Sequence, residues 1–380
     1  MPWGSAFSGI SSEADQPRGR NENKGLNMRY IALCLSSLCF SAGTFAATLD
    51  VGIARSFVRI EDALLKARPG DVISVYPGDY QKTALLVKTP NVHLKAAAEK
   101  ITLDGMGFSY SGKGAIPRAI IQFEPSASGC SLDGFVLVNA SNDSFNGAGV
   151  RINQANNIIV RNCVIQRNEM GIMSNGSVQA NTATNQLIEG CLISDNGTQK
   201  QAGYNHNLYL GGTSVTVRNC EVARSVTGHN IKSRAHVTRV EHCNVHDSAN
   251  REFDLVDGEG NTDILNSDAY LVENRIVKSD NCSGNRNVIH FGKDGKSEHS
   301  GTLYLVRNRI QSPYVTAIVD VSDGKGVHFH DNTISGAKLV LCNLHAPDAK
   351  AFGSGNMLPK NVNPALLPCT EQHGVPKKTD

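Results

Sequence analysis

The feature that most constrains the fold of this chain is a short motif that recurs along its middle. An apolar residue is followed three positions later by Cys or Asn, and two positions after that by another apolar residue, as in VRNCVI, VEHCNV and LVRNRI. The Cys or Asn positions lie 23 to 34 residues apart: Cys163, Cys191, Cys220, Cys243, Asn274, Asn308 and Asn332. Repeats of this length, with short Val/Ile alternations and no long helical pattern, predict stacked β-coils.

The repeat predicts an all-β fold, a right-handed single-stranded parallel β-helix. Its apolar positions face inward, and the Cys and Asn positions form a ladder along an inner turn. A buried Asn can form hydrogen bonds to the backbone of the next coil and to the Asn above it, so the polar groups of such a stack all have partners. The four cysteines are expected to remain buried thiols, because stacked parallel side chains rarely have the geometry that a disulfide needs.

The segment IEDALLKARPGDVISV, residues 60–75, reads as an amphipathic helix, a Pro-Gly turn and a first strand. We expect this helix to cap the first coil of the solenoid. The β-helix is predicted over residues 48–345. Residues 346–380 lose the repeat and are predicted to form an irregular cap, with Cys369 held near the last coils by a bridge to Cys342.

A targeting segment precedes the repeat. Residues 28–47 begin with a positive charge at Arg29, continue with an apolar run and end in Ala46 and Ala47, as a signal peptide does. The run is too short to span a membrane. Residues 1–27 are either an unstructured extension or the product of a start codon assigned upstream of Met28. These features predict a bacterial protein that is periplasmic or secreted.

The stretch TGHNIKSRAH, residues 227–236, concentrates cationic and titratable side chains in one predicted strand. Strand residues alternate between two faces, and small or apolar residues separate the polar ones here. The predicted solvent-facing set is Asn230, Lys232, Arg234 and His236.

Neighbouring coils extend this polar face. Aligning His206 and Asn207 of YNHNLYLGG with His229 and Asn230 places Tyr209 beside Lys232. The next coils, REFDLVDGEG and VIHFG, bring in outward side chains of their own. Because parallel strands stack in register, we expect one groove lined by Tyr209, Lys232, Asp254 and His290.

This mixture of side chains suits β-elimination of an acidic polysaccharide. We expect Lys232 to act as the base, Arg234 or Arg251 to neutralise the substrate carboxylate, and His229 or Tyr209 to donate a proton. The expected substrate-binding side chains are Asn207, Tyr209, Asn230, His236 and His290. Oxygen ligands for a calcium ion would come from Glu252, Asp254 and Asp257, but an acidic surface loop is the favoured interpretation of these three.

The segment IKSRA resembles the Lys-Ser element of the chondroitinase-B-like and alginate lyases of the β-helix class. That resemblance implies that Lys232 is the base, that Arg251 assists it and that a calcium ion lies nearby. The chain departs from this family at LVDGEG, where the family has Arg-His-Gly.

The composition argues against some other classes of protein. A formal net charge of +2 argues against a nucleic-acid-binding protein. We expect a monomer without a membrane span whose partner is an acidic polysaccharide. The same polar face also fits a second class, a non-catalytic β-helix protein that binds glycans or packs in the cell envelope.

Overall fold

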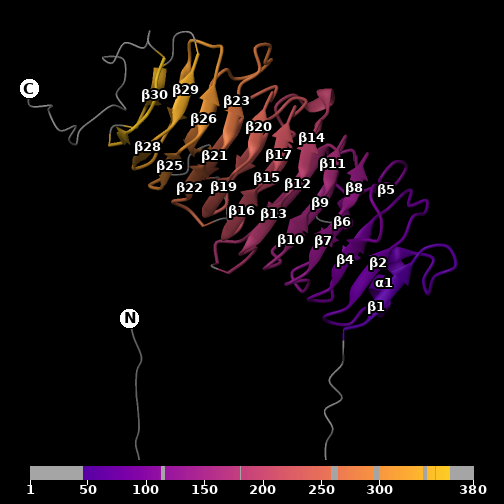
Figure 1. Ribbon diagram of the computed structural model, residues 1–380. Coiled ribbons are helices and arrows are strands. Elements are labelled where there is room, and N and C mark those ends of the chain that lie inside the picture. Colours follow the sequence, from indigo (N-terminus) through magenta and orange to yellow (C-terminus); the bar gives the residue numbers. More distant parts are fainter. Residues whose placement is uncertain are drawn as a thin grey trace, which may run out of the picture. The chain divides into compact units, whose positions relative to one another are not determined.

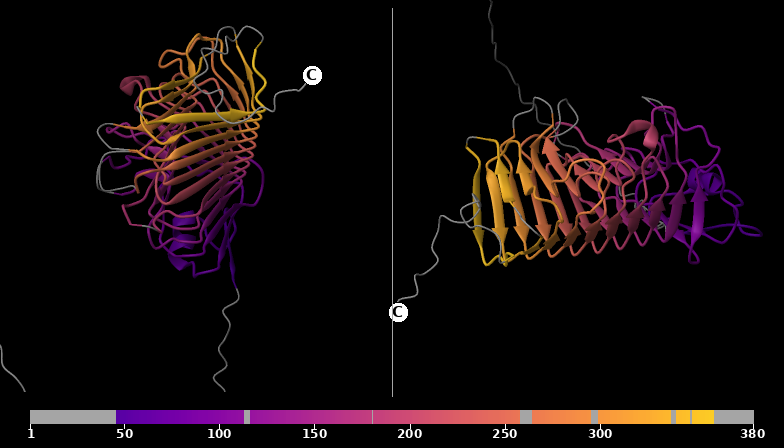
Figure 2. Two further views of the ribbon diagram at one scale, coloured as in Figure 1. Left: turned by 90° about the vertical axis from the view of Figure 1, so that its left-hand side faces the viewer. Right: turned by 90° about the horizontal axis from the view of Figure 1, so that it is seen from above.

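The computed structural model describes residues 46–112, 116–179, 181–257, 264–294, 299–336, 340–346 and 348–359 of the 380. In this part of the chain the strands form three sheets, here called A, B and C, and every strand pairing is parallel. From His93 onward the chain visits sheets A, B and C in turn, one strand each per coil (Figure 1). Figure 2 shows the strands of successive coils lying side by side. The predicted parallel β-helix is confirmed.

The strands are short because each crosses only one side of a coil. Sheet A contains β1 (Thr48–Val51), β2 (Val72–Val75), β4 (His93–Ala96), β7 (Ser131–Asp133), β10 (Ile159–Arg161), β13 (Gln186–Glu189), β16 (Ser214–Arg218), β19 (Val237–Glu241), β22 (Asp268–Val272), β25 (Thr302–Val306), β28 (Gly326–His330) and β31 (Lys350–Ser354). Sheet B contains β5 (Ile101–Asp104), β8 (Phe135–Val138), β11 (Val164–Gln166), β14 (Leu192–Ser194), β17 (Glu221–Ala223), β20 (Asn244–His246), β23 (Arg275–Val277), β26 (Arg309–Gln311) and β29 (Thr333–Ser335). Sheet C contains β3 (Leu85–Val87), β6 (Ala119–Phe123), β9 (Ala148–Asn153), β12 (Met170–Asn175), β15 (Leu208–Leu210), β18 (Ile231–Ser233), β21 (Phe253–Asp257), β24 (Ile289–Lys293), β27 (Ala317–Val321) and β30 (Val340–Leu344).

The recurring motif marks the turn from sheet A to sheet B. The residue just before the Cys or Asn position adopts a left-handed backbone, for example Asn162 with φ 53° and Asn219 with φ 53°. Asn tolerates this conformation better than most residues, so a single residue bends the chain there. The motif therefore encodes a turn as well as an inward side chain.

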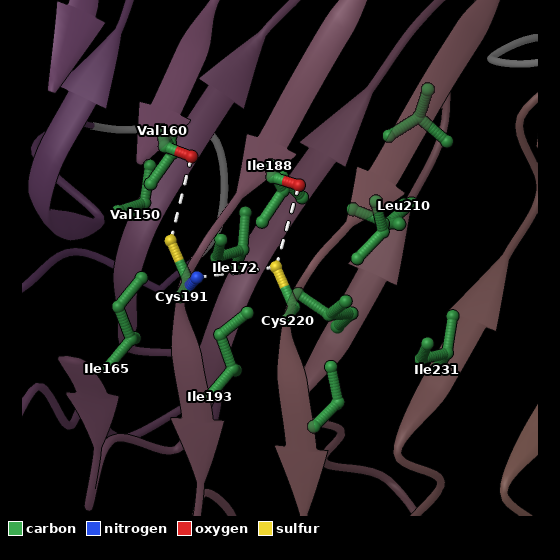
Figure 3. Close-up of a cluster of buried hydrophobic side chains, with 14 of the residues drawn as sticks. Val150, Val160, Ile165, Ile172, Ile188, Cys191, Ile193, Leu210, Cys220 and Ile231 are labelled. Atoms are coloured by element: carbon green, nitrogen blue, oxygen red, sulfur yellow. Dashed lines mark hydrogen bonds between the residues drawn. The ribbon is translucent and has the colours of Figure 1, made fainter. Parts of the chain in front are cut away.

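The predicted inner ladder is present. The backbone N–H of Cys191 donates to the Cys220 sulfur at 3.4 Å, and the N–H of Asn274 donates to Asn308 Oδ1 at 2.9 Å. Figure 3 shows Cys191 and Cys220 among the apolar side chains of the core. Six cysteines of the described part are free thiols. Four of them form the ladder, Cys163, Cys191, Cys220 and Cys243, and the other two are Cys130 and Cys282.

The ends of the solenoid agree only in part with expectation. The predicted helix is α1 (Ile60–Lys66), which packs against β1, β2 and β3 with Ile60 and Ala63 buried. At the other end, β31 extends sheet A to Ser354, beyond the boundary predicted at residue 345. Cys342 is disulfide-bonded, whereas Cys369 lies outside the described residues, as do residues 1–27 and most of the predicted signal peptide.

Candidate active site

One outward-facing side chain from each of eight successive strands of sheet C, β6 to β27, forms a continuous row. Strand register pairs Lys232 with Tyr209 on one side and with Asp254 on the other, and it pairs Asp254 with His290. The predicted alignment of these four residues is confirmed. We call the whole set the outer row; its members in chain order are Gln122, Arg151, Met173, Tyr209, Lys232, Asp254, His290 and Asp320.

Lys232 is a buried cation held by two carboxylates. Its Nζ donates to Asp254 Oδ2 at 2.7 Å and to Asp294 Oδ2 at 2.8 Å. Burial by itself would lower the pKa of Lys232, but these carboxylates outweigh it and raise the pKa above that of an ordinary lysine. The ammonium form is therefore favoured, which is the opposite of what a general base at neutral pH requires.

Asp294 also binds Arg234, whose Nη2 lies 2.6 Å from the same Oδ2 atom. Asp294 follows the end of β24, and its carboxylate bridges Lys232 and Arg234. Sequence reasoning missed this residue, because it lies beyond the strand whose alternation revealed His290. Its position immediately after the HFGK strand was the only signal available.

Asp254 is the anionic centre of the site and is 3% exposed. Burial would raise its pKa, but the hydrogen bond from His290 and the charges of His229 and Lys232 hold the pKa well below its usual range. Arg251 adds a further contact, from Nη1 to Oδ1 at 3.4 Å. Asp254 is thus a fixed carboxylate that orients its cationic neighbours.

His229 and His206 stack with ring centroids 5.0 Å apart. The Arg251 N–H donates to His229 Nδ1 at 3.2 Å, and the His229 N–H donates to His206 Nδ1 at 3.0 Å. Each neutral ring therefore carries its proton on Nε2. Burial lowers the pKa of His229 to about 4, although Asp254 opposes the shift. At neutral pH, His229 is a neutral hydrogen-bond donor and not the imidazolium acid of the sequence hypothesis.

His290 connects Asp254 to a serine that sequence reasoning did not identify. His290 Nδ1 lies 2.8 Å from Asp254 Oδ1, and His290 Nε2 lies 2.9 Å from the hydroxyl oxygen of Ser322. The Lys293 N–H donates to the same hydroxyl oxygen at 3.1 Å. The result is a linear chain from carboxylate to imidazole to hydroxyl, which is the arrangement that activates a serine nucleophile.

Two predicted substrate-binding residues, Asn207 and Asn230, belong instead to the interior. Both are fully buried, and Asn207 Nδ2 donates to Asn230 Oδ1 at 2.8 Å. Asn230 Nδ2 in turn donates to Glu252 Oε2 at 2.5 Å. The prediction that Asn230 faces outward was wrong because β18 begins at Ile231, and two-residue alternation does not extend into the preceding turn.

The three predicted calcium ligands do not converge. Glu252 points into the interior, whereas Asp254 lies on the outer face. Asp257 is 1% exposed and accepts hydrogen bonds from the Ser267 hydroxyl and the Asn266 N–H. Across the described residues, no group of three or more His, Cys, Asp or Glu side chains could hold a metal ion. These carboxylates therefore do not fit the calcium site that was expected.

His236 does not join the outer row. It lies between β18 and β19, and its Nδ1 is 3.2 Å from the Leu265 carbonyl oxygen. Tyr209, in contrast, lies against the site: its ring stacks on His206 with centroids 5.5 Å apart, and the Arg234 guanidinium is 5.5 Å from its ring centroid.

Comparison with known proteins agrees with the architecture. Residues 121–269 match the family model of the right handed beta helix region. No curated protein matches the chain. Among solved structures, pectate lyase Pel9A is similar with a TM-score of 0.50 and 12% identity, covering 84% of this chain and 78% of its own.

Two further structures are similar at lower scores. The catalytic unit of a GH87 α-1,3-glucanase from Streptomyces thermodiastaticus has a TM-score of 0.43 and 17% identity, covering 80% of this chain and 66% of its own. The A-module of the mannuronan C-5 epimerase AlgE6 from Azotobacter vinelandii has a TM-score of 0.40 and 14% identity, with coverages of 79% and 94%. The fold conclusion does not rest on these two. The family model, the three parallel sheets and the likeness to pectate lyase Pel9A show the fold alone: the chain is a right-handed parallel β-helix. No helix in the described ranges is long and apolar enough to cross a membrane.

Proposed function

We propose that the protein binds a uronate-containing polysaccharide in front of the outer row and cleaves it by β-elimination. The observation that carries this proposal is the gathering of Lys232, Arg234 and Arg251 around Asp254 and Asp294. Among the described side chains of this cluster, three cations face two carboxylates, and the excess positive charge favours one carboxylate of a substrate. The predicted signal peptide supports a substrate outside the cytoplasm.

The reaction requires cations that are already in place. Elimination removes the C5 proton, forms a double bond between C4 and C5, and breaks the bond from C4 to O4. Negative charge spreads onto the carboxylate as the proton leaves, and fixed cations stabilise that charge. Lys232 and Arg234 can supply the positive charge for this stabilisation, since the surroundings of Lys232 keep its ammonium group protonated.

We assign the proton transfer to Tyr209. Tyr209 is paired with Lys232 in the strand register, and its ring lies beside Arg234. As the tyrosinate, its oxygen can take the C5 proton and become the neutral phenol. The phenol then gives that proton to the leaving O4, which regenerates the tyrosinate, so that no further acid is needed. This assignment replaces Lys232 as the base, because a lysine held between two carboxylates has no free lone pair.

A second candidate, ester hydrolysis, rests on the chain of contacts from Asp254 through His290 to Ser322. The Ser322 oxygen would bond to the acyl carbon while its proton moves to His290 Nε2. The alcohol would leave with that proton, and water would release the acyl group by the same route. Tyr209 and His290 are separated by three strand spacings, about 14 Å, so the two chemistries would use different parts of the row.

The test is to incubate the protein with alginate, pectate and glycosaminoglycans and to record the ultraviolet absorbance of new unsaturated uronate ends. We expect absorbance with wild type and a rate about 10²–10⁴-fold lower with Tyr209→Phe. Binding without absorbance on every polymer would favour the non-catalytic glycan-binding class. Acetate release from an O-acetylated polymer that Ser322→Ala abolishes and Tyr209→Phe retains would favour ester hydrolysis.

A further inference from the structure

The outer row contains a second buried cation, three strands before Lys232. Arg151 on β9 is 9% exposed. Its side chain makes one hydrogen bond within the described part of the chain, from Nη1 to the sulfur of Met173 at 3.4 Å. A thioether is a weak acceptor, so this hydrogen bond compensates little of the cost of burying the guanidinium.

A neighbouring arginine makes the imbalance larger. The Nε of Arg118 is buried and has no hydrogen-bond partner. Burial lowers the pKa of Arg151 to about 10, and the positive charge of Arg118 adds to the shift, while Tyr204 and Glu124 offset only part of it. Two like charges placed together at low exposure are costly unless an anion joins them.

Four other arginines of the protein have the carboxylate partner that Arg151 lacks. Coil-to-coil pairs with carboxylates recur on the surface: Arg161 with Asp133, Arg218 with Glu189, Arg224 with Asp195, and Arg307 with Glu273. Arg118 and Arg151 have no such pair within the described residues.

We propose that Arg151 and Arg118 form a second anion subsite, which binds a carboxylate of the polysaccharide chain whose reacting unit lies at Lys232. The inference rests on the proposed function, because it takes the ligand class from that site. Arg151 and Lys232 are three strand spacings apart in the outer row, about 14 Å. The polysaccharide therefore crosses the strands of sheet C, and only an oligosaccharide long enough to span this distance contacts both positions.

The experiment measures affinity, so it does not depend on turnover. Acidic oligosaccharides of two to eight uronate units are titrated into wild type, Arg151→Gln and Arg118→Gln by calorimetry at low salt. We expect both variants to lose about 10- to 100-fold in affinity for the long oligomers, the size of a lost hydrogen bond to a charged group. Affinity for the dimer should be unchanged. The control is Lys95→Gln, which removes an equal charge from an exposed position on sheet A and should bind as wild type does.

The outcomes separate the subsite from the reaction. Equal affinity of wild type and Arg151→Gln for the long oligomers would overturn the subsite even if the polymer is cleaved at Lys232. Weakened binding by Arg151→Gln, in a protein that yields no unsaturated product, would support the subsite and contradict only the elimination. Failure of Arg151→Gln to fold would show that the guanidinium is structural and would also overturn the proposal.

Discussion

Lys232 and Arg151 lie in the same outer row and are equally buried, each 9% exposed, but their surroundings are opposite. Lys232 binds two carboxylates, whereas Arg151 meets a thioether and a second arginine nearby. The pKa of Lys232 is raised by its partners, and that of Arg151 is lowered by burial and by Arg118. Burial alone therefore does not reveal what a charged side chain does. A cation paired with carboxylates, such as Lys232, stabilises its own site. A cation without such a partner, such as Arg151, is available to bind an anionic ligand.

The largest expected difference between the two cations is in catalytic activity. Lys232→Met should lower kcat/KM about 10²- to 10³-fold, because a fixed positive charge at the reacting carboxylate is lost. Lys232→Arg should retain much of the rate, since it keeps the charge. Arg151→Met should act mainly by raising KM. The measurement is steady-state kinetics on a long uronate oligomer, and Lys232→Arg as inactive as Lys232→Met would restore the lysine as the base.

The two positions should also differ in their contribution to the free energy of unfolding. Lys232→Met leaves Asp254 and Asp294 short of a cation and should lower the free energy of unfolding by about 3 kcal/mol at neutral pH. Arg151→Met removes an uncompensated charge and should leave the free energy of unfolding unchanged or higher. Urea unfolding of both variants with wild type as reference tests this difference. A marked loss of stability in Arg151→Met would mean that Arg151 is compensated after all.

A smaller effect concerns Glu252, a buried carboxylate on the interior side of the same coil, 3.8 Å from the Lys278 ammonium. Burial raises the pKa of Glu252 to about 8, and Lys278 offsets part of the shift. A glutamate in the unfolded chain titrates near pH 4.3, so the folded state binds the proton more tightly. Stability should therefore fall as the pH rises from about 4 to about 8, by at most about 1.4 kcal/mol per pH unit.

The measurement for Glu252 is urea unfolding at intervals between pH 5 and pH 8. Glu252→Gln should remove the part of the slope that Glu252 causes, because its side chain does not titrate. His229, with its lowered pKa, contributes a slope of opposite sign in both proteins, so it cancels in the comparison. Asp254 does not interfere in this range, since a carboxylate with a lowered pKa contributes stability above its unfolded value near pH 3.9 and loses it only at lower pH. An equal slope in wild type and Glu252→Gln would show that Glu252 is ionised in the folded protein throughout.

Much of the fold could be predicted from the sequence, because a solenoid repeats local rules. The spacing of Cys163 and its successors identified both the coil length and an inward ladder. The alternation around Lys232 identified one face of a strand, and parallel register then placed Tyr209 and Asp254 beside it. Each of these inferences needs only the geometry of a strand and the stacking of identical turns.

What the sequence alone determined about this protein is thus the β-helix and the order of four side chains in the outer row: Tyr209, Lys232, Asp254 and His290. Only the tertiary structure decided which of these side chains meet and in what charge state. Asn230 and Glu252 turned inward because they precede strands, where alternation no longer applies. Asp294 and Ser322 reach the row from turns 60 or more residues beyond Lys232. The protonation of Lys232 and the unmet charge of Arg151 depend on such distant partners, because electrostatic energy is set by distances in space, whereas the sequence specifies only distances along the chain.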